Sequence, residues 1–242
     1  GDAFRNKYVF KEPISTRSNR KGGYSLSNYS GYSTTDDVML LANKKLGDFT
    51  LDGFLGGSLY FRENNEQKSA TSNGLNMPGF FSLNASVDPA TTSSSVTKEQ
   101  INSLYGKIGF SWKSAVFIEV TGRNDWASTL AKSERSYFYP SISGSLVISE
   151  LAPLPEIFNF WKIRGSWAQT KYPTGVYDIN STYSVSRNYW GNTTAAFYPS
   201  TIRDVSLRPR SSRSYEIGTD LYFFNNRLKF DLAYYHKLLY DL

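Results

Sequence analysis

Few residues of this chain could do acid–base or nucleophilic chemistry. The chain has one histidine, His236, so a Ser-His-Asp arrangement would have to be built around that residue, and no nucleophile-elbow motif accompanies it. Asp36 and Asp37 are adjacent, and the other carboxylates are separated by whole predicted strands, which fits pore-lining charge better than a glycosidase pair. We therefore expect no enzymatic activity.

The composition also argues against binding of metals, cofactors and nucleic acid. There is no cysteine and no calcium-loop spacing, so we expect neither a metal site nor a cofactor. The formal net charge is +6, but the lysines and arginines are scattered over predicted strands and loops, with no helix to enter a groove. We expect no nucleic-acid partner.

The elements that position the charged residues are predicted to be strands. Between residues 49 and 61, apolar and polar side chains alternate with the two-residue period of a strand. One face carries Phe49, Leu51, Leu55, Leu59 and Phe61, and the other carries Thr50, Asp52, Ser58 and Tyr60. Aromatic residues make up 16% of the chain, a content typical of sheets and membrane interfaces. The sequence therefore predicts an all-β fold.

The same alternation predicts about nine strands in total. They are expected at residues 23–32, 36–45, 49–61, 104–112, 116–121, 138–148, 161–167, 215–223 and 228–235. Short connections are expected at 33–35, 46–48, 113–114 and 224–227, and a longer one on the same side as the tight turns at 149–159. Long, polar connections are expected at 62–102, 123–136 and 171–213.

Charged residues gather on one face of these strands. The expected inward-facing set is Asp52, Lys107, Glu119, Lys162, Arg164, Glu216, Asp220, Lys229 and Asp231. A lysine or arginine that faces lipid at mid-bilayer costs about 2–4 kcal/mol, so this segregation is expected where the apolar face meets lipid. No apolar run approaches the roughly 20 residues of a membrane-spanning helix. We predict an antiparallel transmembrane β-barrel segment with a polar lumen, short periplasmic turns and long extracellular loops.

The alternation has a second interpretation. In a soluble β-sandwich the apolar face is buried and the charged face meets water. The two interpretations differ in whether one set of residues faces lipid or a core: Phe49, Leu55, Ile108, Val116, Ile118, Leu146 and Ile163. A soluble, secreted carbohydrate-binding sandwich therefore stays open at this point, as does a passive porin or adhesin barrel.

Several short motifs are similar to those of one family. They are NSLYG at 102–106, VTGRNDWASTL at 120–130, SYFYPSIS at 136–143, KIRGSWAQ at 162–169, LRP at 207–209, SYEIGTDL at 214–221 and FFNNRL at 223–228. In this order and spacing they resemble the SusC/RagA-like TonB-linked (TonB-dependent) outer-membrane transporters of Bacteroidetes. The resemblance is dense from residue 36 onward and thin before it.

The resemblance implies a place and a function for the chain. It implies part of a plugged barrel of about 22 strands in the bacterial outer membrane, in contact with lipid and lipopolysaccharide. It implies energy-coupled import of an oligosaccharide or a peptide, with a SusD-like surface lipoprotein as partner. Residues 2–5 do not read as a signal peptide, and residues 228–242 are strand-like to the end. We therefore expect residues 1–242 to be a partial barrel domain, without the plug, the TonB box through which TonB would act, and the closing strands.

Aromatic residues in the third long connection are candidate contacts with substrate or lipoprotein. The candidates are Tyr177, Tyr183, Tyr189, Trp190, Phe197 and Tyr198, with Arg203 beside them. The alternative is that these rings pack the loop upon itself or belong to an interfacial girdle. A cluster of arginines could bind an anionic ligand or lipopolysaccharide phosphates, although a solvated, charge-balanced loop explains it better: Arg203, Arg208, Arg210 and Arg213. The segment 123–126 is expected to be a structural corner at the end of a strand.

Overall fold

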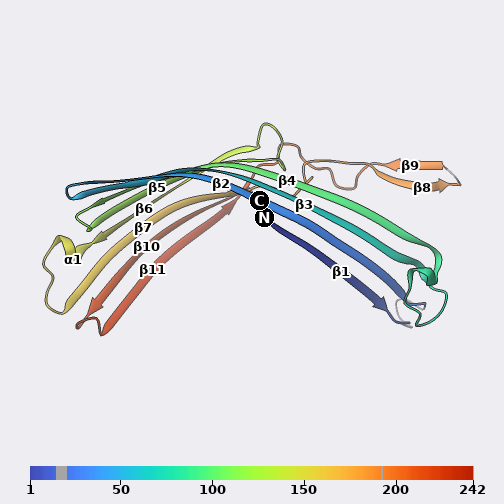
Figure 1. The fold of residues 1–242 in the computed structure, drawn as a ribbon, viewed down its shortest axis with the longest axis horizontal. Coiled ribbons are helices and arrows are strands. Elements are labelled where there is room, and N and C mark those ends of the chain that lie inside the picture. Colours follow the sequence, from blue (N-terminus) through green and yellow to red (C-terminus); the bar gives the residue numbers. More distant parts are fainter. Residues whose placement is uncertain (15–20, 192, 242) are drawn as a thin grey trace. The chain divides into compact units, whose positions relative to one another are not determined.

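The computed structural model describes residues 1–14, 21–191 and 193–241, without the side chains of residues 187–190 (Figure 1). The described chain is nearly all strand. The strands are β1 (Asp2–Glu12), β2 (Gly23–Leu46), β3 (Phe49–Leu75), β4 (Ser86–Trp112), β5 (Val116–Ala127), β6 (Ser136–Val147), β7 (Phe158–Tyr172), β8 (Ser184–Trp190), β9 (Thr193–Phe197), β10 (Arg210–Phe223) and β11 (Leu228–Tyr240). One turn of 3₁₀ helix, η1 (Leu83–Ala85), and one turn of helix, α1 (Ile148–Leu151), complete the elements.

Nine of the strands form one antiparallel sheet. Its order is β1-β2-β3-β4-β5-β6-β7-β10-β11, so every strand lies beside its neighbour in sequence except where the β8-β9 hairpin intervenes. The up-and-down order and the antiparallel pairing are those of an outer-membrane barrel wall. The predicted all-β, antiparallel fold class is confirmed.

The chain divides into two compact units. Unit 1 comprises Gly1–Thr35 and Tyr60–Gln100, and unit 2 comprises Asp36–Leu59 and Ile101–Leu242. Unit 1 contains β1 and parts of β2, β3 and β4. Unit 2 contains the remaining parts of those three strands and all the later elements.

Two of the tight turns in unit 2 contain residues that tolerate positive φ. Gly47, between β2 and β3, has a φ of +61°, which glycine adopts without steric cost. Between β10 and β11, Asn225 and Asn226 have φ values of +56° and +65°, and asparagine is enriched in this conformation. The predicted turns at 46–48, 113–114 and 224–227 are confirmed.

The predicted loop at 62–102 is wrong. β3 continues to Leu75 and β4 begins at Ser86, so most of this polar segment is paired strand. Ion pairs join the two strands, with Arg62 Nη2 2.7 Å from Glu99 Oε2 and Lys98 Nζ 3.1 Å from Glu63 Oε2. Strand ladders are held by backbone hydrogen bonds, so a polar sequence can form them when its side chains pair across strands.

Three further boundaries differ from the expectation. Residues 33–35 are not a connection, because β2 runs unbroken from Gly23 to Leu46, and β1 was not predicted at all. The connection expected at 171–213 contains the β8-β9 hairpin and the first residues of β10. The connection at 123–136 is shorter than expected, because β5 extends to Ala127.

The apolar faces of the strands in unit 2 are exposed. Leu55, Ile108 and Ile118 are 56%, 63% and 44% exposed. Among the described residues, the buried apolar cluster consists of Ala127, Leu130 and Tyr137, which is far too small for the core of a sandwich. A soluble β-sandwich would bury these apolar residues under a second sheet, so the sandwich interpretation does not fit the structure.

No helix in the described part of the chain is long and apolar enough to cross a membrane.

Candidate functional site

The polar face of unit 2 carries two clusters of ion pairs, and the first is centred on Arg164 of β7. Arg164 Nη1 lies 2.6 Å from Asp220 Oδ1, and Nη2 lies 2.8 Å from Asp231 Oδ1. The Glu216 carboxylate is more distant, at 3.6 Å from Nε. Asp220 and Asp231 are directly opposite in the β10-β11 register, where like charges destabilise a sheet. The guanidinium therefore joins two carboxylates that would otherwise repel each other.

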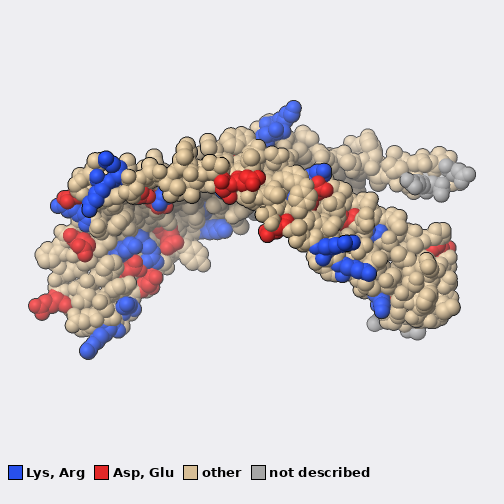
Figure 2. Space-filling model, in the orientation of Figure 1, with Lys and Arg blue, Asp and Glu red and all other residues tan. Residues whose placement is uncertain are grey.

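The second cluster is centred on Lys107 of β4. Lys107 Nζ lies 3.2 Å from Asp52 Oδ2 on β3 and 3.1 Å from Glu119 Oε2 on β5. One ammonium group thus bridges the strands on both sides of its own. Acidic and basic side chains lie close together in Figure 2, in the region of β7, β10 and β11.

Between the two clusters the polar face is hollowed. The hollow has a volume of about 390 Å³ and is lined by residues of both clusters. Four of its lining residues stand in one register row across β5, β6, β7 and β10: Glu119, Ser143, Ser166 and Glu216. The floor therefore consists of small hydroxyl side chains between two carboxylates, an arrangement that can hydrogen-bond a polar solute or water.

The structure brings most of the predicted inward-facing residues together. Asp52, Lys107 and Glu119 form one cluster, and Arg164, Glu216, Asp220 and Asp231 form the other. Lys162 is in register with Asp220. Lys229 lies on the same face, with its Nζ 4.9 Å from the centroid of the Tyr222 ring. That these residues line a lumen stays a prediction.

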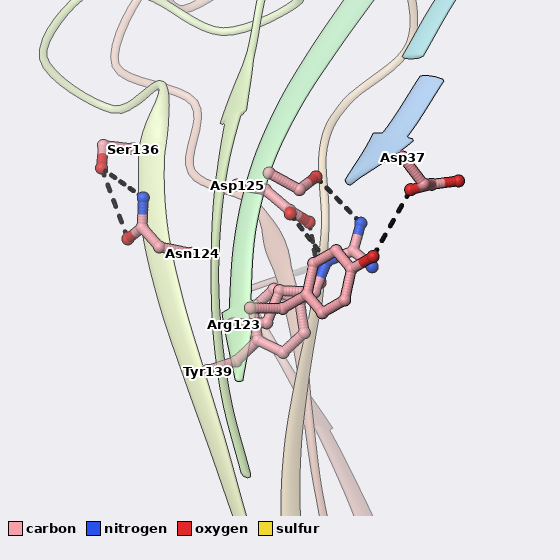
Figure 3. Close-up of polar contacts among 8 residues, drawn as sticks. Asp37, Arg123, Asn124, Asp125, Ser136 and Tyr139 are labelled. Carbon is pink, nitrogen blue, oxygen red and sulfur yellow. Dashed lines mark hydrogen bonds and ion pairs between the residues drawn. The ribbon is translucent and has the colours of Figure 1, made fainter. Parts of the chain in front are cut away.

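A third polar cluster lies toward the loop ends of β5 and β6 (Figure 3). The Asp125 carboxylate is 5% exposed and accepts two hydrogen bonds. Arg123 Nε donates to its Oδ1 at 2.8 Å, and the Tyr139 hydroxyl donates to its Oδ2 at 2.7 Å. Arg123 Nη2 also donates to the Ser103 hydroxyl at 3.0 Å. These contacts tie the end of β5 to both neighbouring strands.

The same cluster extends to β2 through Tyr105. The Arg123 guanidinium lies 5.6 Å from the centroid of the Tyr105 ring, and the Tyr105 hydroxyl is 3.4 Å from Asp37 Oδ1. On the opposite face of β5, the Asn124 amide donates to the Ser136 hydroxyl at 3.1 Å. The sequence did not single out Tyr105 or Tyr139. The two-residue spacing of Arg123 and Asp125, which places them on one face of a strand, was the available signal.

The predicted loop contacts lie in the segment between β7 and β10. The rings of Tyr183 and Tyr198 meet edge to face, with centroids 5.7 Å apart at 81°, and both residues are exposed. Tyr177 is also exposed, at a turn where its φ is +65°. The side chains of Tyr189 and Trp190 lie outside the described part. The structure therefore brings together one pair of the predicted aromatic residues.

Arg203 is held within the same loop. Its guanidinium contacts the Asp178 carboxylate at 2.5 Å, and its backbone N–H donates to the Ser181 hydroxyl at 2.9 Å. Next to it, the backbone N–H and the hydroxyl of Ser206 both donate to Asp204, and these bonds lower the pKa of the Asp204 carboxyl. The base of the β8-β9 hairpin is thus closed by polar contacts.

The described residues hold no group of three or more His, Cys, Asp or Glu side chains that could bind a metal ion. The chemistry that the polar clusters support is hydrogen bonding and charge pairing with solutes.

Comparison with known proteins gives a consistent result. Residues 2–242 match the family described as "TonB dependent receptor-like, beta-barrel". The chain is 24% identical over 231 residues to TonB-dependent receptor P3 of Formosa agariphila, covering 91% of this chain and 23% of that protein. It is 26% identical over 200 residues to TonB-dependent receptor P26 of the same species, covering 78% of this chain and 20% of that protein. The chain thus spans about a quarter of the length of these relatives or less.

Solved structures share the fold. The RagAB peptide transporter superposes with a TM-score of 0.82 at 16% identity, over 98% of this chain and 27% of that chain. The siderophore receptor PiuA from Acinetobacter baumannii gives a TM-score of 0.52 at 14% identity, over 96% of this chain and 36% of that chain. At these identities the likeness establishes the arrangement of strands and nothing about ligands.

Proposed function

The chain belongs to the TonB-dependent receptor-like β-barrel family, and from this membership we propose that it forms part of the wall of an outer-membrane nutrient importer. The family consists of receptors and transporters rather than enzymes, and it resides in the outer membrane. We propose that the strands of unit 2 cross that membrane repeatedly, with the turns at 46–48, 113–114 and 224–227 on the periplasmic side.

One observation carries this proposal: the two faces of the sheet in unit 2 suit different solvents. One face holds the ion-pair clusters of Lys107 and Arg164 around a polar hollow. The other exposes large apolar side chains such as Ile108, Ile217 and Leu232, which are 60–63% exposed. A wall between a water-filled lumen and lipid needs this division.

Aromatic residues near the tight turns fit the same picture. Phe49 lies 5.6 Å from Phe110 and 6.4 Å from Trp112, measured between ring centroids. Phe158 and Phe223 are 4.7 Å apart in the same way. Aromatic rings collect at the membrane–water interface in outer-membrane barrels, so we place one interface at this level of the strands.

The partners of the importer belong to the proposal. The fold is shared with a peptide transporter, RagAB, and this favours a two-component importer in which a SusD-like lipoprotein covers the extracellular side. We propose that TonB acts on a part of the longer protein outside these residues. The exposed Tyr183–Tyr198 pair and Tyr177 are then contacts with the lipoprotein or the nutrient, and the cargo is an oligosaccharide or a peptide.

The proposal is tested by energy-dependent uptake. The full-length gene is deleted in its host, and growth is measured on defined oligosaccharides and peptides as sole carbon or nitrogen sources. We expect growth on one of these classes to be lost, and to be lost equally when TonB is deleted. Uptake that survives the loss of TonB would indicate a passive porin instead.

A further inference from the structure

An aromatic shelf lies on one face of unit 1, on the strands β1 and β2. Four register pairs follow one another on this face: Phe4 with Gly31, Asn6 with Tyr29, Tyr8 with Ser27 and Phe10 with Ser25. Each pair joins one aromatic ring to one small or polar residue. We call these eight residues the aromatic shelf. Residues two apart in a strand are separated by about 6.8 Å, so the shelf extends over about 20 Å.

The rings of the shelf are accessible and held in place. Phe4, Tyr8 and Phe10 are 46%, 59% and 61% exposed. The Tyr8 and Tyr29 rings meet edge to face, with centroids 5.4 Å apart at 81°. The Tyr29 hydroxyl donates to Glu66 Oε1 at 2.8 Å, and this hydrogen bond holds the Tyr29 ring in place. A rigid, exposed ring loses little entropy when a ligand packs on it.

A lipid-facing aromatic girdle does not explain these rings. A strand crosses the hydrocarbon layer with about 9–11 residues, whereas β3 and β4 each have 27 residues. The Tyr29 hydroxyl of the shelf donates to the Glu66 carboxylate, and a charged group on a lipid-facing surface is costly. The shelf is therefore assigned to a water-facing surface, where a row of exposed rings calls for another explanation.

The shelf is uncharged and rich in hydrogen-bonding groups. A groove of about 440 Å³ is lined by Phe4, Asn6, Tyr8, Ser27 and Tyr29, none of which carries a formal charge.

We propose that the aromatic shelf binds a neutral oligosaccharide of pyranose units. The electron-rich ring faces attract the weakly positive C–H groups of a sugar ring, and the interleaved amide and hydroxyl groups hydrogen-bond its hydroxyls. The residues that line the groove carry no cation to pair with an acid, and the Glu66 carboxylate bonded to Tyr29 repels anions, so acidic sugars are disfavoured. A length of about 20 Å accommodates several sugar units in a row. This inference rests on the proposed import function and selects its substrate class.

The test is binding of neutral hexasaccharides of glucose, mannose and xylose to the full-length protein in detergent, measured by calorimetry. We expect at least one to bind, with an affinity that does not change between low and high salt because no charge pairs form. Tyr8→Ala and Tyr29→Ala are each expected to weaken binding about tenfold, a loss comparable to removing one stacked ring. Tyr8→Phe keeps the ring and should retain the affinity.

The matched control is Tyr32→Ala, which removes an exposed ring from the opposite face of β2. Unchanged affinity in Tyr8→Ala and Tyr29→Ala, or a loss equal to that of Tyr32→Ala, would overturn the shelf as the site. Binding of peptides but of none of the hexasaccharides would overturn the ligand class. In both cases TonB-dependent uptake in the growth assay would still support the importer, so the two failures can be told apart.

Discussion

Replacing Asp125 tests whether the polar cluster at the end of β5 stabilises the fold. The Asp125 carboxylate is nearly buried and accepts bonds from Arg123 and Tyr139 at 2.8 and 2.7 Å. A hydrogen bond to a charged group contributes about 1.5–3 kcal/mol. The Arg123 side chain is 42% exposed, so water replaces part of its bond and the lower value applies. We expect Asp125→Ala to lower the free energy of unfolding by about 3 kcal/mol.

A second variant divides this loss between the two bonds. Tyr139→Phe removes one donor and should cost about 1.5 kcal/mol. Both substitutions remove the bond between Tyr139 and Asp125, so their losses should not add in the variant that carries both. The coupling free energy should be about 1.5 kcal/mol. The free energy of unfolding is measured by urea titration of the full-length protein in micelles, followed by tryptophan fluorescence.

Asn124→Ala is the control, because Asn124 lies on the opposite face of the same strand and its side chain pairs with an exposed Ser136 hydroxyl. Its cost should stay within about 0.5 kcal/mol. An Asp125→Ala variant no less stable than Asn124→Ala would refute the view that this cluster holds the three strands together.

Three other perturbations follow from the contacts of single residues. Gly218→Ala should lower the thermal unfolding temperature more than Gly144→Ala, because a Cβ at Gly218 would lie 2.9 Å from a guanidinium nitrogen of Arg164, whereas one at Gly144 would lie 3.5 Å from the Phe117 carbonyl oxygen. Arg203→Ala should increase hydrogen exchange at residues 178–203, since it removes the ion pair that closes the hairpin base. The bonds from Ser206 lower the pKa of Asp204, so they stabilise the loop at pH values above the carboxyl's ordinary pKa. This stabilisation is lost as the pH falls through the lowered pKa. Proteolysis in that loop should therefore increase only when the pH falls below the ordinary pKa range of a carboxyl group. In Ser206→Ala the increase should begin at a higher pH.

The sequence predicted the hairpins of unit 2 well because two independent signals agree there. Alternation marks the strands, and residues that tolerate positive φ, Gly47 and Asn225, mark two of the turns. The third turn has positive φ at Lys113 and Ser114. The inward-facing charges followed from the same alternation, and the ion pairs of Lys107 and Arg164 join most of them across strands.

Most of unit 1 was missed: residues 23–32 were predicted as a strand, but β1 and the paired strands within 62–102 were not. A two-residue period is visible only where one face of a strand is apolar and the other is polar. Both faces of the segment 60–100 are polar. The prediction of about nine strands agreed with the nine-stranded sheet only because two errors cancelled. β2 was divided in two at residues 33–35, and β1 was not recognised.

The glycines of the polar face explain how its large side chains fit. A Cβ at Gly109 would lie 2.6 Å from the Asp52 carboxylate, and one at Gly56 would lie 2.7 Å from the Tyr105 ring. At Gly218 it would meet the Arg164 guanidinium. Glycine weakens a strand interior and marks places where another group approaches closely. Each polar cluster thus has a glycine next to one of its side chains, and the missing Cβ leaves room for that side chain. Glycine at these positions lowers the strand propensity, but it leaves room for the side-chain contacts that join the strands.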